Sequence, residues 1–330
     1  MAIIDHKGKI RGIAGSVIFR GYRKKQIVQG KPKAYPLTAA SITSSSEFGL
    51  ISSAASAIRK AFLPAYRYYD GPAVGRVTSA VSKCVRGAAG TVAGERDLHD
   101  GELSHLNGLE FNLNNPLSAV LLVKPQVERD IEGVVRVLMP AMNLSKDLKI
   151  PQSIKGKTYR VKVRFLLTGF NFRENYYEYI DNQEISYQRD EKTEAQTIEM
   201  RGTVPSGCIL VLSMSLSFYS FSDMDQELVL LNSVECSPCA IIGSWKDTRV
   251  IPLGQETSEG PADTALRTSM NYTGNRLLAD LPNKIVQQAR SATYPRQVLF
   301  KQTSDKSITH ALIRNEKDDV GIVAGKRVMF

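Results

Sequence analysis

The residues that could carry out chemistry are few and are scattered along the sequence. Cys236 and Cys239 form a Cys-x-x-Cys pair, which could hold a metal ion or act as a redox couple. A structural zinc site needs four ligands, usually from two such pairs, and the four His residues supply no second pair. Pro238 lies between two strand-like segments, where a redox pair is not expected. We therefore predict reduced thiols and no metal or other cofactor.

A polar segment with two histidines is the next candidate for chemistry. His99 and His105 lie among Asp97, Asp100 and Glu102, but a spacing of six residues matches no metal-binding helix pattern. We interpret this segment as a polar connecting loop. The sequence contains neither a G-x-S-x-G nucleophile elbow nor a complete phosphate-binding loop. We therefore expect a protein that is not an enzyme.

Aromatic side chains gather in one part of the sequence: Phe170, Phe172, Tyr176, Tyr177, Tyr179 and Tyr187. An exposed patch of this kind could stack on sugars or on nucleic-acid bases. Strands and protein interfaces use the same residue types. We favour a core or interface role for this aromatic patch, with carbohydrate binding as an alternative.

Positive charge is concentrated at the N-terminus. The whole chain of 330 residues has a formal net charge of +10, whereas residues 1–96 alone hold 16 Lys and Arg against 4 Asp and Glu. Such a segment can neutralise phosphates, dock on a neighbouring subunit, or form a solvated face. Within residues 1–33, Asp5 is the one acid among nine basic candidates for subunit or nucleic-acid contacts: Lys7, Lys9, Arg11, Arg20, Arg23, Lys24, Lys25, Lys31 and Lys33.

The elements expected in residues 1–96 are a hairpin and two helices. The apolar runs 17–19 and 26–28 flank a Gly-containing basic turn, which is typical of a hairpin. A helix is predicted over 44–63, with Ser44 and Glu47 as a capping box and an apolar stripe that begins at Phe48. A second helix is predicted over 72–89, with Pro72 at its first position. The glycine-rich hairpin has little side chain for a core, so we expect its backbone to pair with another element.

From about residue 107 to residue 250 the hydrophobic period changes to two, which predicts strands. Their number and spacing favour an antiparallel β-sandwich or jelly-roll-like body, in a protein that is mainly β with a few helices. The predicted strands are Leu109–Leu113, Ser118–Val123, Gly133–Leu138, Tyr159–Gly169, Tyr176–Tyr187, Ala195–Met200, Cys208–Tyr219, Glu227–Leu231 and Ala240–Trp245.

The last 80 residues differ in composition from the predicted sandwich. After a polar stretch, a helix is predicted over 275–292, with Pro282 producing a kink or two shorter pieces. Three strand-like pieces follow, at 296–301, 307–314 and 320–329. We therefore expect three regions: residues 1–96 as basic arm, hairpin and helices, residues 97–250 as the sandwich, and residues 251–330 as an extension that wraps neighbouring subunits.

The N-terminal pattern G-K-x-x-G-x-x-G-x-V resembles a known family. It runs from Gly8 to Val17, is followed by the aromatic Phe19 and a basic turn, and ends at Lys31-Pro32-Lys33. This is similar to an uncharacterised domain-of-unknown-function family of Bacteroidota and their phages. The resemblance covers about residues 7–245 and implies a Gly-Lys-rich hairpin, a helix and a β-rich remainder. It implies no catalytic residues and favours a bacterial or phage source.

Together these observations lead us to expect a structural protein that self-assembles into a shell, tube, fibre or other particle, with a phage virion as the setting. The basic arm and the C-terminal tail would contact copies of the chain and other assembly subunits, and the arm could touch nucleic acid. The alternatives are a nucleic-acid-binding protein and a carbohydrate-binding β-sandwich. The N-terminus has no signal-peptide core and no apolar run approaches the roughly 20 residues of a spanning helix, so we expect a virion or host-cytoplasm location without a membrane span.

Overall fold

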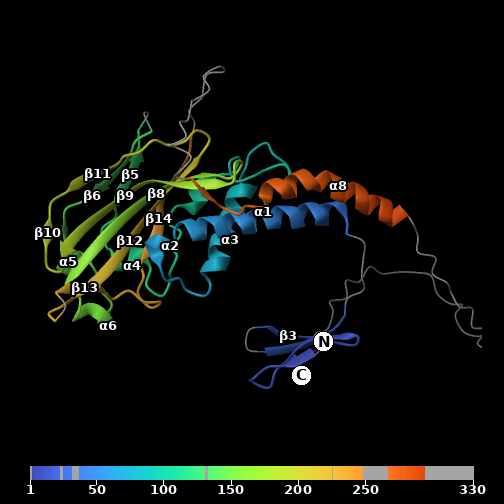
Figure 1. Ribbon diagram of the computed structural model, residues 1–330, viewed down its shortest axis with the longest axis horizontal. Coiled ribbons are helices and arrows are strands. Elements are labelled where there is room, and N and C mark those ends of the chain that lie inside the picture. The colour runs from blue at the N-terminus through green and yellow to red at the C-terminus, as the bar shows by residue number, and fades with distance from the viewer. Residues whose placement is uncertain are drawn as a thin grey trace, which may run out of the picture. The chain divides into compact units, whose positions relative to one another are not determined.

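Figure 1 shows the computed structural model, which describes residues 2–22, 25–31, 37–130, 133–224, 226–247 and 267–293. The predicted strand-like pieces at 296–301, 307–314 and 320–329 lie outside the described residues, as does the polar stretch that precedes residue 267.

A six-stranded antiparallel sheet is the centre of the body. Its strands follow the order β13-β12-β8-β9-β15, and β14 also pairs with β12. The two central strands carry alternating apolar side chains over most of their length, which is why they form one long ladder. The bounds are β8 (Arg160–Asn171), β9 (Tyr176–Gln188), β12 (Ile209–Ser222), β13 (Glu227–Leu230), β14 (Cys239–Lys246) and β15 (Thr268–Ser269).

One face of this sheet packs against a second, smaller sheet. Val161, Val163 and Phe165 of β8 point to this side and share a core with Val135 and Val137 of the smaller sheet. Two sheets packed face to face form an antiparallel sandwich, so the predicted fold class is confirmed. The smaller sheet has the order β11-β6-β5, formed by β5 (Gln126–Arg129), β6 (Val135–Met139) and β11 (Gln196–Met200), and β7 (Met142–Asn143) pairs with β10 (Lys192–Thr193).

The other face of the large sheet is covered by helices. Leu166, Phe170 and Phe172 of β8 and the turn after it lie in one core with the buried faces of α1 and α3. Tyr272, which follows β15, belongs to the same core. This core therefore crosses both of the expected region boundaries, at 96/97 and at 250/251. The helices are α1 (Ala39–Ala61), α2 (Leu63–Tyr66), α3 (Ala73–Arg86), α4 (Leu117–Val120), α5 (Leu144–Asp147), α6 (Gln152–Lys155) and α8 (Gly274–Thr293), with a short 3-10 turn at Leu103–Leu106.

The start of α1 differs from the prediction. The helix begins at Ala39, where the Thr38 hydroxyl accepts a hydrogen bond from the backbone N–H of Ser41. The predicted Ser44–Glu47 capping box is wrong, because Glu47 is buried in mid-helix and its carboxylate pairs with Arg96 at 3.0 Å. The predicted apolar stripe is buried at Ile51, Ala55, Ile58 and Phe62, whereas Phe48, at which it was predicted to begin, is exposed.

The predicted strand Ser118–Val123 is also wrong. This segment contains the one-turn helix α4, because the Glu110 carboxylate accepts hydrogen bonds from the backbone N–H groups of Leu117 and Ser118. The predicted strand Leu109–Leu113 is not formed either, because this segment pairs with β14 only through an isolated bridge between Glu110 and Ala240.

The other two predicted helices are present with shifted details. Pro72 precedes the first helical residue of α3 instead of occupying it. The helix α8 continues through Pro282 as one element and runs beside α1 (Figure 1). Leu278 and Leu281 pack on the protein interior, and this burial offsets the backbone hydrogen bond that Pro282 cannot donate.

The N-terminal segment forms a four-stranded antiparallel meander, which we call the N-terminal sheet. The predicted hairpin is confirmed as β3 and β4, and two further strands, β1 and β2, precede it. Gly12 and Gly15 adopt positive φ of 106° and 59°, a conformation that glycine tolerates. These glycines also interrupt the alternation of side chains by which a strand is recognised in a sequence. The bounds are β1 (Ala2–Ile4), β2 (Ile10–Ala14), β3 (Val17–Tyr22) and β4 (Lys25–Gly30).

A phenylalanine at the contact of helices and sheet tests this shared core. Phe170 is fully buried, with its ring centroid 5.8 Å from Phe172 and 5.9 Å from Phe62. We expect Phe170→Ala to lower the free energy of unfolding by about 3–5 kcal/mol in urea titrations. Phe48→Ala is the matched control, because Phe48 is 59% exposed on α1 and its loss is expected to change stability by at most about 0.5 kcal/mol. Equal effects of the two substitutions would contradict the packing described.

Candidate functional site

The N-terminal sheet is unusual because it has no core. No residue among 2–22 and 25–31 is buried. Ile3, Ile4 and Val28 are 65%, 68% and 58% exposed. An independently stable sheet normally buries at least one apolar face, and a few strands without such a face are marginal in water. The sheet therefore exposes the kind of surface that proteins usually cover.

Apolar side chains lie on both faces of this sheet. In the β3–β4 register Phe19 is opposite Val28, and Arg20 is opposite Ile27. Side chains alternate between faces along a strand, so Phe19 and Val28 share one face while Ile18 and Ile27 share the other. A strand that is apolar on both faces is typical of a sheet covered on both sides.

The basic residues of the arm lie around these apolar positions. Arg11 makes an exposed ion pair with Asp5 at 3.4 Å, and Asp5 also accepts hydrogen bonds from the backbone N–H groups of Lys7 and Lys9. The hydrogen bond from Lys9 is the main reason that the pKa of Asp5 lies below its ordinary value. The described basic candidates are Lys7, Arg11, Arg20, Lys25 and Lys31, which are exposed, and Lys9, which is half-buried. Arg23, Lys24 and Lys33 lie outside the described residues.

The six aromatic candidates do not form a common exposed patch. Phe170, Phe172, Tyr176 and Tyr187 are buried, so their ring faces are not available for stacking on a ligand. Tyr177 is half-buried, and the Tyr179 hydroxyl donates a hydrogen bond to the backbone carbonyl of Ala61 at 2.7 Å. Phe170, Phe172 and Tyr177 pack in the core between the large sheet and the helices, whereas Tyr187 lies in the core with the smaller sheet.

A second exposed apolar surface lies on the body, and the sequence analysis did not identify it. We call it the body patch. It combines the segment after α2, the start of α3 and two loops, and its five side chains are between 40% and 51% exposed: Tyr68, Tyr69, Val74, Leu113 and Val234. Residues so far apart in the sequence give no local periodic signal, which is why pattern analysis missed them.

Buried polar side chains hold the segments of the body patch together. Asp70 accepts a hydrogen bond from the backbone N–H of Leu113 at 2.8 Å and pairs with Arg76 at 2.9 Å. Burial raises the pKa of Asp70, but the contacts with Arg76 and Leu113 outweigh it and hold the pKa below its ordinary value. Asn112 is fully buried and donates to the backbone carbonyl of Val234 at 2.7 Å. The patch is therefore presented on a fixed backbone.

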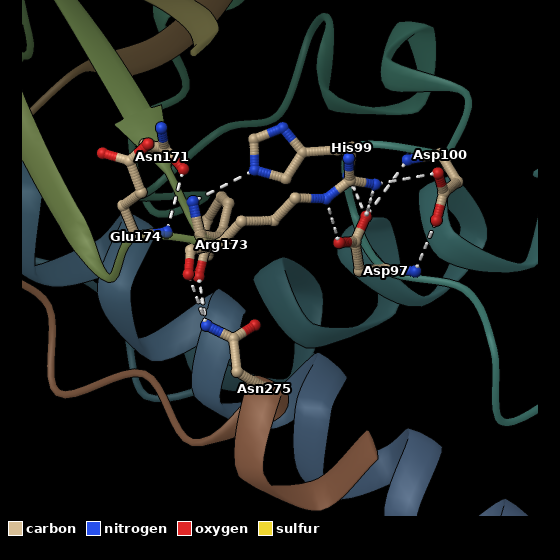
Figure 2. A network of polar contacts seen from close by, with 8 residues as sticks. Asp97, His99, Asp100, Asn171, Arg173, Glu174 and Asn275 are labelled. Atoms are coloured by element: carbon tan, nitrogen blue, oxygen red, sulfur yellow. Dashed lines mark hydrogen bonds and ion pairs between the residues drawn. The ribbon is translucent and has the colours of Figure 1, made fainter. Parts of the chain in front are cut away.

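The chemically richest cluster surrounds His99, in the segment that was predicted to be a polar loop (Figure 2). Arg173 pairs with Asp97 at 2.8 Å and with Asp100 at 3.0 Å. His99 accepts a hydrogen bond at Nε2 from the backbone N–H of Phe172 at 3.0 Å. Burial alone would raise the pKa of Asp97, but the hydrogen bond from Arg173 keeps it below its ordinary value.

This cluster connects three elements of the fold. Asn275, at the start of α8, donates hydrogen bonds to the backbone carbonyls of Phe172 and Arg173, both at 2.9 Å (Figure 2).

Desolvation by burial lowers the pKa of His99, which is therefore neutral at pH 7. Its Nε2 already accepts a hydrogen bond from the backbone N–H of Phe172, and the carboxylates of Asp97 and Asp100 are both paired with Arg173. The groups hold one another in place and support a structural role.

The thiols also have a structural setting. Cys84, Cys208, Cys236 and Cys239 are all buried and free of disulfides. Burial raises the pKa of Cys84, Cys208 and Cys236 to about 12, so these thiols are protonated at neutral pH. Within the described ranges, no three His, Cys, Asp or Glu side chains come together as a metal-binding group.

Comparisons with protein-family models, curated proteins and solved structures find no match to this chain. The resemblance of the N-terminal pattern to a Bacteroidota family thus stays a prediction. In the part of the chain that the structure describes, no helix is both long and apolar enough to cross a membrane.

The His99 cluster predicts a pH dependence of stability. Because the pKa of His99 is lowered in the folded protein from 6.5, the unfolded chain binds the proton more readily. The free energy of unfolding is therefore expected to fall as the pH decreases below about 6.5. His99→Gln should reduce this dependence between pH 7 and pH 5 in urea titrations. His105→Gln, which removes an exposed histidine nearby, is the matched control. If His99→Gln keeps the pH profile of the unmodified chain, His99 is not the source of the pH dependence.

Proposed function

We propose that this protein is a non-enzymatic structural subunit that self-assembles into a larger particle, and that its N-terminal sheet is buried between subunits in that particle. The observation that carries the proposal is a four-stranded sheet with apolar residues on both faces and no buried residue among those described. The body, in contrast, already has two complete cores of its own.

The energetics of the N-terminal sheet support this function. Fixing the backbone costs about 1–2 kcal/mol per residue, and apolar burial is the main contribution that offsets it. Fully burying a Val or Ile side chain contributes about 1.5–3 kcal/mol. Ile3, Ile4 and Val28 make little of that contribution while they stay more than half exposed. Contact with another subunit would supply the missing burial.

The proposed setting is a phage virion or the cytoplasm of its host. It rests on the resemblance of the N-terminal pattern to a family of Bacteroidota and their phages. Whether the chain forms a particle is the first part of this proposal that the light-scattering experiment below tests.

Nucleic-acid binding is the second candidate function, and one observation favours it. Arg20 and Lys25 are exposed on the same face of the N-terminal sheet as Tyr22. Cations beside an exposed aromatic ring suit a single-stranded nucleic acid. Such binding would weaken steeply with salt because counterions are released from phosphates, whereas apolar burial persists at high salt.

The mass of the chain in solution tests the first proposal. We expect light scattering of the full chain to show discrete particles that persist at 0.1 M and at about 1 M salt. A chain lacking residues 1–31 should be monomeric, and its circular dichroism should show a folded body, because none of the residues 2–22 and 25–31 belongs to either core. A full chain that is monomeric at every concentration and salt would contradict self-assembly.

The same samples test the second candidate. If nucleic acid is the partner, a labelled oligonucleotide should bind the full chain with an affinity that falls as salt increases. Arg20→Ala with Lys25→Ala should weaken this binding and reduce the salt slope by about two, since each phosphate contact contributes about one. Lys83→Ala with Lys155→Ala, on α3 and α6, is the control of equal charge. Equal affinities of the two double variants would refute a phosphate site on this face.

A further inference from the structure

We infer that a cavity in the body binds a small apolar amine and that the carboxylate of Glu110 receives the ammonium group of this ligand. The cavity has a volume of about 320 Å³ and lies between β12, β14 and the segment that contains α4. The inference concerns the body alone and is independent of the proposed self-assembly.

Apolar side chains form most of the cavity wall. Leu117, Leu121 and Val123 come from α4 and the residues after it, whereas Met214 of β12 and Ile242 of β14 come from the large sheet. Met214 is fully buried, so the cavity reaches into the protein interior. A cavity of this size, with apolar walls and few polar groups, is typical of a small-molecule site. The walls therefore favour a ligand with an apolar body.

Glu110 is a polar group held in a fixed position at this cavity. Its segment is joined to β14 by backbone hydrogen bonds such as that from Gly108 to the carbonyl of Ile241, at 2.8 Å. The Glu110 carboxylate accepts hydrogen bonds from the backbone N–H groups of Leu117 at 2.9 Å and Ser118 at 3.0 Å, and from the Ser118 hydroxyl. A carboxylate offers about four acceptor sites, so one remains for a ligand.

Within the described part of the chain, the Glu110 carboxylate has no ion-pair partner. Arg76 donates to the backbone carbonyl of Glu110 at 3.3 Å, but its ion pair is with Asp70, at 2.9 Å. Burial raises the pKa of Glu110, and the hydrogen bonds to the carboxylate offset this effect only in part. An ammonium group in the cavity would supply positive charge and donate a charge-assisted hydrogen bond.

Lys124 also lines the cavity, and its charge favours the opposite ligand, a carboxylate. The Lys124 side chain is exposed, so water and salt screen its charge. Glu110 is half-buried, where a charge acts more strongly on a ligand. The balance between these two residues therefore favours an amine, and the experiment compares both kinds of ligand.

Three ligands of similar size and different charge provide the first experiment. Isothermal titration calorimetry of the full chain compares phenethylamine with phenethyl alcohol and with phenylacetate. We expect the amine to bind about tenfold more tightly than the alcohol, as a charge-assisted hydrogen bond implies, and phenylacetate to bind most weakly. If the amine does not bind at millimolar concentration, or binds no more tightly than the alcohol or phenylacetate, the inference is wrong.

Substitutions in the full chain locate the site. Glu110→Gln keeps the shape of the side chain and removes its charge, so the dissociation constant for phenethylamine should rise at least about tenfold. Glu128→Gln, at an exposed position of β5, is the matched control and should leave the dissociation constant unchanged. Equal affinities of these two variants would overturn the role of Glu110.

A second pair of variants tests the cavity without altering Glu110. Val123→Phe places a larger side chain in the cavity and should abolish binding of phenethylamine. Val229→Phe makes the same change on β13, at a side chain that is 48% exposed, and should leave binding intact. Thermal unfolding checks that all four variants remain folded. Equal affinities of Val123→Phe and Val229→Phe would place the amine elsewhere and overturn the inference.

Discussion

The structure depends on two long neighbouring strands, β8 and β12, which are apolar on both faces where residues 166–170 of β8 pair with residues 209–213 of β12. Leu210 and Leu212 of β12 point into the core with the smaller sheet, and Ile209 and Val211 point into the core with the helices. A sheet of this kind has to be covered twice. The smaller sheet covers one face and α1 and α3 cover the other, so the three layers follow from one constraint. The polar clusters around His99 and Asp70 then join the loops that connect these layers.

Most of the sheet could be predicted from the sequence, because alternating side chains identify strands wherever one face is buried. The strands β8, β9 and β12 begin and end within a few residues of their predicted bounds. Errors occurred where a tertiary contact determines the local structure. Glu47 resembles a capping residue but pairs with Arg96, and Glu110 caps a helical turn in a segment that was predicted to be a strand. Neither partner lies near enough in the sequence to be recognised there.

The basic arm and the body patch likewise differ in how far the sequence alone reveals them. The basic arm was visible in the sequence because its residues are contiguous. The body patch was not, because Asp70, Asn112 and Val234 come together only in the folded chain. The aromatic candidates show the limit of composition as a guide, since Phe170 and Phe172 have the residue type of a stacking surface and the location of a core. Residue type suggests what a side chain can do, and burial decides whether it can reach a partner.

The body and the N-terminal sheet are thus in different energetic situations. The body satisfies its apolar surface internally, whereas the N-terminal sheet keeps Ile4 and Val28 exposed on strands that would be stable only when covered. Our account attributes this difference to assembly.

Hydrogen–deuterium exchange measured over a range of protein concentrations tests that claim most directly. The account predicts that amides of residues 2–30 become protected as the concentration rises, while protection of β8 and β12 stays constant. Equal exchange of the N-terminal amides at all concentrations would contradict it.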